Sequence, residues 1–303
     1  MPALEVRDLK KSYGAVRALD GVTLSVGKGE IYGLLGRNGA GKTTLVKILL
    51  SIVRPSSGEA RLLERPVSDP KARERVGYLP EDHRFPEYHT GESALDYFGA
   101  LSGVPGDERR RRIPGLLERM ELTDAASRKI RTYSKGMKQR LGLAQAILHD
   151  PDVIFLDEPT DGVDPVGRKQ VRELLLELKS RGRTIFLNSH LLSEVEQICD
   201  RVGIMEKGRL VREGTIASLT PRANVFEVRV EGPVDAAWPD LVALVPGAVR
   251  SGDLLELPLG EGRQVDPMID LLRAKGVSVR GVSERKKSLE DIFIDTVTEP
   301  RKG

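Results

Sequence analysis

The chain has 303 residues, of which 39% are hydrophobic and 31% are charged. Its 48 basic and 45 acidic residues leave a formal net charge of +3, so the composition excludes a nucleic-acid-binding protein that relies on an overall basic charge. The single cysteine, Cys199, excludes an internal disulfide and indicates a reducing compartment. The longest apolar run, residues 45–53, is too short to span a membrane, and the N-terminus has no signal-peptide pattern. We therefore expect a cytosolic, globular protein.

Strands and helices alternate over most of the chain. Apolar runs bounded by glycine predict strands, and a 3.6-residue apolar period predicts helices. In chain order, the predicted elements are strands at 3–9, 21–26 and 30–36, a helix at 42–53, a strand at 75–80, helices within 91–148, a strand at 152–157, a helix at 164–182, a strand at 184–189, a short helix at 191–200 and a hairpin at 202–214. Buried strands separated by helices predict a parallel α/β sheet with a helical insertion.

The pattern changes near residue 221. The rest of the chain reads as strand, helix, two strands, helix and strand, which is a βαββαβ unit of the ferredoxin-like type, with one further helix. We therefore expect two domains, 1–220 and 221–303. A dimer brace and a regulatory domain are both open interpretations of the second.

The segment 131–146 begins a predicted helix with unusual charges. Ser134 is a suitable N-cap residue, and apolar residues recur from Leu141 at helical spacing. The first turn nonetheless carries Lys135 and Lys138 and no acid, although the positive end of a helix dipole favours carboxylates.

A glycine-rich pattern, G-x-x-x-x-G-K-T, lies between a predicted strand and a predicted helix. Glycines let the backbone curl so that its N–H groups point at phosphate oxygens, and the helix adds its positive end. Lys42 is expected to reach the β- and γ-phosphates, and Thr43 to hold Mg²⁺ through its hydroxyl. A glycine turn with a surface lysine is the alternative, which this context disfavours. The predicted nucleotide-binding residues are Gly36, Arg37, Asn38, Gly39, Ala40, Gly41, Lys42, Thr43 and Thr44.

Two acids and a histidine follow predicted buried strands. Asp157 and Glu158 are adjacent at a strand end, where their side chains diverge and can serve different partners. Asp157 is suited to bind Mg²⁺ beside Thr43, and Glu158 to orient and deprotonate an attacking water. His190, just past the next strand, is placed to reach a γ-phosphate or that water. Taken singly, a solvated strand end and a surface histidine are the alternatives.

These motifs, in this order, resemble the nucleotide-binding subunit of an ABC transporter over about residues 3–220. The resemblance implies a P-loop NTPase fold with an antiparallel β subdomain and a helical subdomain at about 86–148. It assigns Tyr13 to adenine stacking, residues 77–82 to the Q-loop, 133–140 to the signature motif, 161–164 to the D-loop and 188–190 to the switch-histidine segment. Residues 288–297 resemble the C-terminal extension of bacterial export-type subunits, in drug-resistance, lipid, polysaccharide or sodium export systems.

Two positions depart from the family pattern. The Q-loop position, usually glutamine, is Glu81, whose carboxylate adds charge beside phosphates and is a candidate Mg²⁺ ligand with Thr43 and Asp157. The signature motif, usually serine, two glycines and glutamine, keeps Ser134 and Gly136 but has Lys135 in place of the first glycine and methionine in place of the glutamine. Lys135 either reaches a phosphate or points into solvent.

The resemblance also implies a mechanism and partners. In the family, two subunits clasp two ATP molecules head to tail. Ser134, Lys135 and Gly136 would therefore meet the ATP of the partner subunit, and its phosphate would be the anion that the start of their helix lacks. We expect ATP and Mg²⁺ as cofactors, Lys42, Glu158 and His190 as catalytic residues, and a homodimer or a pair with a paralogous subunit. We further expect a separate membrane permease, transport in the direction of export, a position at the inner face of the cell membrane, and no nucleic-acid partner.

Two other classes are open. The first is a soluble ABC-type ATPase acting on ribosomes, DNA or a regulator. Relatives that act in translation usually carry two nucleotide-binding domains, and those that act in DNA repair usually carry long coiled-coil or zinc insertions. This class is disfavoured because the chain has one set of nucleotide motifs, no heptads and no paired cysteines. A binding module without catalysis is disfavoured by Glu158 and His190.

The insertion is locally basic. Residues 107–140 hold eleven basic and five acidic residues, including the run Arg109–Arg112. A solvated helix face is the simpler interpretation, and attraction to acidic lipid headgroups or to an acidic permease loop is the alternative.

Overall fold

The computed structural model describes residues 1–220, 222–259 and 264–298. The chain forms two compact units, one comprising Met1–Ile216 with the chain from Thr296, the other Ala217–Asp295. The sequence prediction put a domain boundary at residue 221. Residues 221, 260–263 and 299–303 of the predicted second domain lie outside the described residues.

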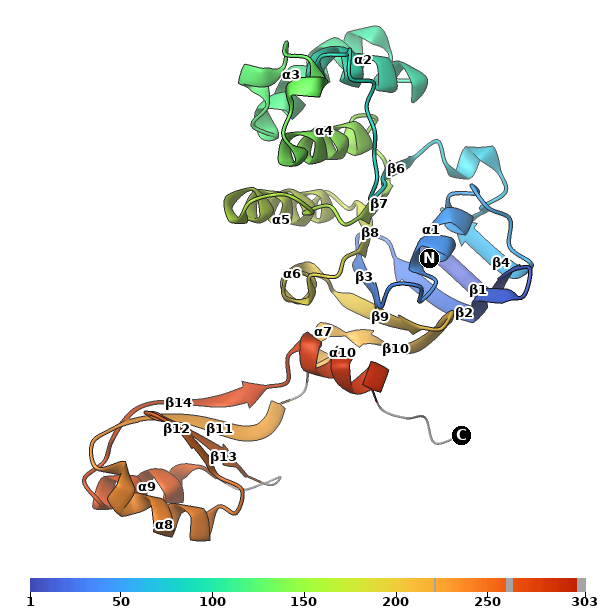
Figure 1. Ribbon diagram of the computed structural model, residues 1–303. Coiled ribbons are helices and arrows are strands. Elements are labelled where there is room, and N and C mark those ends of the chain that lie inside the picture. Colours follow the sequence, from blue (N-terminus) through green and yellow to red (C-terminus); the bar gives the residue numbers. More distant parts are fainter. Residues whose placement is uncertain (221, 260–263, 299–303) are drawn as a thin grey trace. The chain divides into compact units, whose positions relative to one another are not determined.

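The first unit contains two sheets (Figure 1). Its strands are β1 (Pro2–Tyr13), β2 (Val16–Gly27), β3 (Ile31–Gly36), β4 (Ser57–Leu62), β5 (Arg65–Pro66), β6 (Val76–Leu79), β7 (Val153–Asp157), β8 (Thr184–Asn188), β9 (Arg201–Glu206) and β10 (Arg209–Thr215). An antiparallel sheet has the order β2-β1-β4-β5, and a larger sheet the order β10-β9-β3-β8-β7-β6. In the larger sheet all neighbours pair in parallel except β9 and β10, which form the predicted hairpin.

Helices cover the larger sheet and form an insertion between β6 and β7. They are α1 (Lys42–Leu49), α2 (Gly91–Leu101), α3 (Gly106–Arg119), α4 (Lys135–Ile147), α5 (Pro165–Ser180) and α6 (Leu192–Ile198), with short 3₁₀ turns at Pro70–Ala72, Thr123–Ala125 and Ile130–Thr132. The short helix α7 (Ile216–Leu219) begins at the last residue of the segment Met1–Ile216 and continues into the second unit. Helices α2, α3 and α4 make up the insertion, at the top of Figure 1. The parallel α/β fold with an antiparallel subdomain and a helical insertion is therefore confirmed.

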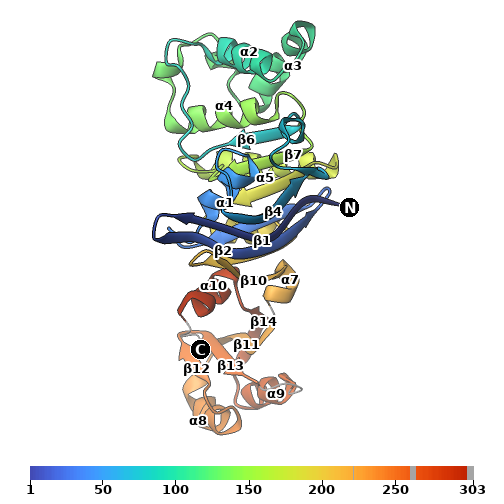
Figure 2. The ribbon, with the colours of Figure 1, turned by 90° about the vertical axis from the view of Figure 1, so that its right-hand side faces the viewer.

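The central strands are buried on both faces. Every residue of β7 and of β8 is buried. Strands that are covered on both faces read as apolar runs, without the alternation of apolar and polar residues that marks a half-exposed strand. Helix α1 lies between the two sheets and contributes Leu45, Ile48 and Leu49 to a core shared with β1, β2 and β3 (Figures 1 and 2). This packing fixes the start of α1, and with it the phosphate loop, against both sheets.

Two sequence predictions differ from the structure. The predicted helix at 42–53 ends at Leu49, because Ser51 takes a positive φ of 58° before the proline-containing turn. Strand β4 was missed because only Ala60 and Leu62 of its six residues are buried, so it lacks an apolar run. It is a strand because it pairs with β1 along the antiparallel sheet.

The basic run in α3 is largely paired within the insertion. Arg109 contacts Asp96 at 2.7 Å, Arg112 contacts Glu108 at 2.7 Å, and Arg110 contacts Asp107. These neighbours favour the interpretation of a solvated helix face over one of an open binding surface.

The second unit contains β11 (Arg222–Glu231), α8 (Val234–Leu244), β12 (Val249–Ser251), β13 (Leu254–Pro258), α9 (Asp266–Ala274), β14 (Ser278–Lys286) and α10 (Leu289–Thr298) as far as Asp295. Its antiparallel sheet has the order β12-β13-β11-β14. Its core joins Val228 and Leu255 of the sheet to Leu241 of α8 and Leu272 of α9, so both helices cover one face.

Candidate functional site

The phosphate loop connects β3 to α1 at the edge where the parallel strands end. Gly41 immediately precedes α1 with φ 105°, and no side chain caps the helix. The first turn of α1 contains no acidic residue, so its positive end is left for an anion. Lys42 Nζ donates hydrogen bonds to the carbonyl oxygens of Gly36 at 2.5 Å and Arg37 at 3.3 Å, so the amine lies over the loop.

Gly41 is required for steric as well as conformational reasons. A Cβ atom there would lie 2.5 Å from the carbonyl oxygen of Ala18, whereas a Cβ on Gly39, at φ 81°, would meet no atom within 4 Å. Gly39→Ala is therefore expected to cost only positive-φ strain, about 1–3 kcal/mol. Gly41→Ala is expected to lower the melting temperature further and to weaken ATP binding, because the backbone of β2 must move. Thermal unfolding and ATP titration of both variants test this; equal losses would contradict the steric explanation.

A cleft of about 780 Å³ opens over the phosphate loop. Among the predicted residues, those that line it are Tyr13, Asn38, Gly39, Ala40, Gly41, Lys42, Thr43, Thr44, Glu81, Glu158 and His190. The structure thus brings together residues from the start of the chain, the Q-loop and the ends of β7 and β8. Tyr13 is 46% exposed at the cleft rim, with Lys11 Nζ 4.9 Å from its ring centroid. An exposed aromatic ring at this rim is available for stacking on a planar base.

Asp157 lies buried at the base of this region, with 3% of its surface exposed. Burial raises its pKa to about 6, while a hydrogen bond from Asn188 Nδ2 at 2.5 Å opposes that shift. Burial also lowers the pKa of the Lys42 amine, while the negative charges of Glu158, Asp157 and Glu81 act in the opposite direction. Within the described residues, the Asn188 Oδ1 atom is buried without a hydrogen-bond partner. A buried carboxyl and an unpaired oxygen are the chemistry that a hard cation and its bound waters would satisfy.

Glu158 has an unusual backbone that several hydrogen bonds hold in place. Its φ is 50°, a left-handed conformation that costs a non-glycine residue energy and occurs at functional sites. The Glu158 N–H donates to the Asn188 carbonyl at 2.8 Å, and its own carbonyl accepts from Gln139 Nε2 of α4 at 2.8 Å. The side chain is therefore directed by contacts with β8 and with the helical insertion.

His190 is paired with Glu158. Its ring Nδ1 lies 2.8 Å from Glu158 Oε2, and its backbone N–H donates to Glu158 Oε1 at 3.0 Å. The imidazole remains 69% exposed and the carboxylate 12% exposed, so both groups are accessible from the cleft. A carboxylate oriented by a histidine is an arrangement suited to positioning and deprotonating a water molecule.

The predicted signature residues lie elsewhere on the surface. None of the described residues that line the cleft comes from 134–136. Ser134 caps α4, its Oγ accepting from the Met137 N–H at 3.2 Å. Lys135 does not line the cleft of its own chain; its Nζ lies 2.7 Å from Asp161 Oδ2 in the D-loop segment, and its side chain is 67% exposed. That contact holds the pKa of Asp161 below its usual value.

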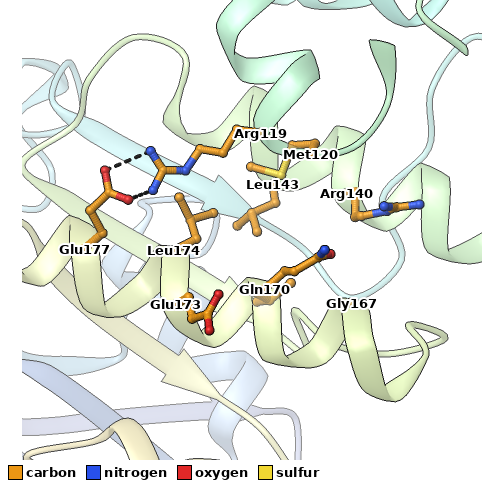
Figure 3. Close-up of a pocket in the computed structure, with 10 residues that line it drawn as sticks. Arg119, Met120, Arg140, Leu143, Gly167, Gln170, Glu173, Leu174 and Glu177 are labelled. Carbon is orange, nitrogen blue, oxygen red and sulfur yellow. Dashed lines mark hydrogen bonds and ion pairs between the residues drawn. The ribbon is translucent and has the colours of Figure 1, made fainter. Parts of the chain in front are cut away.

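A second cavity, of about 270 Å³, lies between α5 and the helical insertion (Figure 3). Met120, Leu143 and Leu174 form its apolar lining, and Arg119 and Glu177 form an ion pair across its edge. Among the described residues it shares no lining residue with the nucleotide cleft. It marks the seam between the insertion and the sheet-bearing part of the unit.

Several residues of the site were missed by sequence reasoning. Val16, Arg17 and Ala18 line the cleft because the β1–β2 hairpin returns past the phosphate loop, and Asn188 lines it from the end of β8. Gln139 is a helix residue without any local signal for its contact with Glu158. Asn188 alone had a usable signal, since it is a polar residue at the end of a buried apolar strand.

Comparisons with known proteins agree with this geometry. Residues 19–161 match the family model described as ABC transporter. Over 289 residues the chain is 41% identical to an uncharacterized ABC transporter ATP-binding protein of Synechocystis, covering 94% of this chain and 79% of that protein. It is 37% identical to the Nod factor export ATP-binding protein I of Paraburkholderia xenovorans, covering 96% of each. A solved structure described as the ATP binding subunit of an ABC transporter matches with a TM-score of 0.68 and 33% identity, covering 72% of this chain and 91% of that one.

Proposed function

Because this chain belongs to the ATP-binding subunits of ABC transporters, which bind and hydrolyse ATP, we propose that it drives a separate membrane permease, in the direction of export, by closing head to tail on a second nucleotide-binding subunit. The observation that carries this proposal is the cleft that joins the phosphate loop, Glu158 and His190, while the signature helix α4 begins outside it.

The cleft has the features that ATP with Mg²⁺ requires. The phosphate loop and the start of α1 would hold the β- and γ-phosphates, Lys42 would neutralise their charge, and Tyr13 would stack on the adenine. Thr43 and Asp157 fit a magnesium ion, since Mg²⁺ is commonly held by one or two side chains together with substrate phosphates. Glu81 lines the same cleft and is a further candidate ligand. When bound, Mg²⁺ would supply positive charge for the phosphoryl group that is transferred.

Hydrolysis follows from the arrangement of this chain's own residues. We assign Glu158 to orienting an attacking water and accepting its proton, and His190 to holding the Glu158 carboxylate through their 2.8 Å contact. Lys42 would stabilise the negative charge on the γ-phosphate oxygens, because it is held over the loop by Gly36 and Arg37.

A second subunit would complete each site. The first turn of α4 has the Ser134 hydroxyl at its cap and no acidic residue, so its positive end suits a phosphate as the missing anion. Since these residues do not line their own chain's cleft, we assign Ser134 and Gly136 to the partner subunit's ATP. Lys135, whose Nζ is held 2.7 Å from Asp161 Oδ2 in the single chain, is the third residue that we propose for that ATP.

The permease would dock on the helical insertion. Tyr88 and Tyr97 are 74% and 47% exposed, and their ring centroids lie 4.8 and 5.6 Å from that of His89, with the rings tilted by 32° in each pair. Beside them lies a hollow of about 450 Å³ lined by His83, Arg84, Phe85, Glu87 and Lys138, just after Glu81. Exposed aromatic clusters mark protein–protein contacts. No helix in the described part of the chain is both long and apolar enough to cross a membrane, and we propose a peripheral position at the inner membrane face, held by the permease.

The test is co-expression with candidate multi-spanning membrane proteins from the same genome. Co-purification is expected, and a Tyr88→Ser, Tyr97→Ser double variant should weaken it at least about tenfold, because an interface anchor contributes about 2 kcal/mol or more. Basal ATP turnover should not change. Leu176→Ser, at an exposed apolar residue of α5, is the matched control. Isolation with ribosomes or DNA in place of a membrane protein would overturn the transport proposal.

A further inference from the structure

We propose that Glu194 is a positioning residue for ATP hydrolysis, which holds the segment carrying His190 against the loop carrying Glu158 by accepting a hydrogen bond from Thr160. The inference rests on the roles proposed above for Glu158 and His190. The Glu194 carboxylate does not line the cleft, and it belongs neither to the phosphate loop nor to the signature motif.

Glu194 is a buried charged residue whose carboxylate has three partners, Thr160, Arg168 and Arg172. It lies in α6, its side chain is 11% exposed, and Thr160 is 3% exposed. Thr160 Oγ1 donates a hydrogen bond to Glu194 Oε2 at 3.0 Å. The other oxygen, Oε1, lies 3.9 Å from both Arg168 Nη1 and Arg172 Nη1 of α5. Burying a carboxylate is costly unless it is paired and hydrogen-bonded, and here both oxygens are engaged.

The contact joins the two segments that carry the reactive pair. Thr160 follows Glu158 by two residues, and Glu194 follows His190 by four. The same two segments are also joined where they leave β7 and β8, because the Glu158 N–H donates a hydrogen bond to the Asn188 carbonyl at 2.8 Å. The pair of Glu158 and His190 thus lies between two anchors, one at the end of β8 and one at Glu194.

Those anchors matter because packing does not hold the histidine ring. His190 is 69% exposed, so few neighbouring atoms restrict its position. Its 2.8 Å approach to Glu158 depends on where the backbone between β8 and α6 lies. A displacement of about 1 Å at a reacting group can cost orders of magnitude in rate. An anchor that sets this backbone therefore acts on turnover more than on ATP binding.

The arginines extend the anchor to the D-loop segment. Arg168 Nε also donates to the Val163 carbonyl at 3.0 Å, and Asp164 Oδ1 accepts from the Gly167 N–H at 2.7 Å at the start of α5. Glu194 thereby links α6, the residues after Glu158 and the beginning of α5. The D-loop segment is thus joined to the segment that orients His190.

The test uses the full-length protein and measures ATP turnover, ATP affinity and melting temperature together. Thr160→Val removes only the donor at nearly constant volume, and kcat is expected to fall about tenfold while ATP affinity stays within about twofold. Thr160→Ser keeps the donor and should recover kcat to within about threefold of the original protein. Glu194→Gln should lower kcat at least about threefold, because one carbonyl oxygen cannot serve both Thr160 and the arginines. Glu173→Gln, at an exposed carboxylate of α5, is the matched control and should change nothing.

A double-mutant cycle separates positioning from a structural role. In a His190→Ala background, Thr160→Val should lower kcat by less than about twofold, because the residue through which it acts is gone. An undiminished loss in that background, or unchanged kcat in Thr160→Val, would overturn the inference. If Thr160→Val does not fold, Glu194→Gln decides by the same cycle. These outcomes are distinct from failure of the proposed function, in which Glu158→Gln would itself retain turnover.

Discussion

Glu158→Gln is expected to leave ATP binding intact and to lower ATP turnover by about 10²–10⁴-fold, the usual contribution of a general base. Glutamine has the shape of glutamate and can still accept from the His190 N–H, which now lies 3.0 Å from Glu158 Oε1. It cannot take a proton from water. The phosphate loop is untouched, because its contacts come from Gly36, Arg37 and Lys42.

The measurement is steady-state phosphate release together with ATP titration of the same preparation. Glu173→Gln on α5 serves as the control, since it removes a carboxylate far from the cleft lining. A variant that hydrolyses ATP at the original rate would refute the assignment of Glu158 as base. A variant that no longer binds ATP would show instead that Glu158 supports the cleft structurally.

Ser134→Arg is expected to spare ATP binding by a single subunit and to reduce turnover by at least about 10²-fold, the cost of losing one preorganised electrostatic contact to the transition state. Ser134 lies at the start of α4, outside its own chain's cleft, so the long cationic side chain should not disturb the ATP bound in the same chain. In a head-to-tail pair it would occupy the place of the partner's γ-phosphate.

The dimer provides a second readout for Ser134. If ATP joins two subunits and hydrolysis releases them, the Glu158→Gln protein should elute as a dimer in ATP and Mg²⁺, and adding Ser134→Arg should return it to monomer. Because Ser134 also caps α4, its loss can cost about 1 kcal/mol of stability. Ser134→Gly, which costs only a few tenths as a cap, controls for that effect. Retained turnover in Ser134→Arg would refute the assignment of α4 to the partner's ATP.

The contiguous motifs of this protein could be predicted from sequence, because their geometry is local. The phosphate loop depends on glycines at fixed spacing between a buried strand and a helix. The helix starts at Ser134 and Asp164 are also local, because each side chain accepts a hydrogen bond from an N–H group in the first turn of the helix that it caps. Burial of β7 and β8 follows from their unbroken apolar runs. By contrast β4, whose residues are mostly polar, exists because β1 offers it a pairing edge.

The sequence by itself thus determined the fold class and the identity of the phosphate-binding, acidic and histidine residues. Only the tertiary structure decided their partners. Parallel pairing of β7 with β8 places Asp157 beside Asn188 and Glu158 beside His190, and the position of α4 in the folded chain directs Gln139 to the Glu158 carbonyl. The same position gives Lys135 an acidic partner, Asp161, where the sequence left a choice between phosphate and solvent. Such contacts join residues far apart in the chain, and their individual partners exist because strand register and helix packing fix which side chains meet.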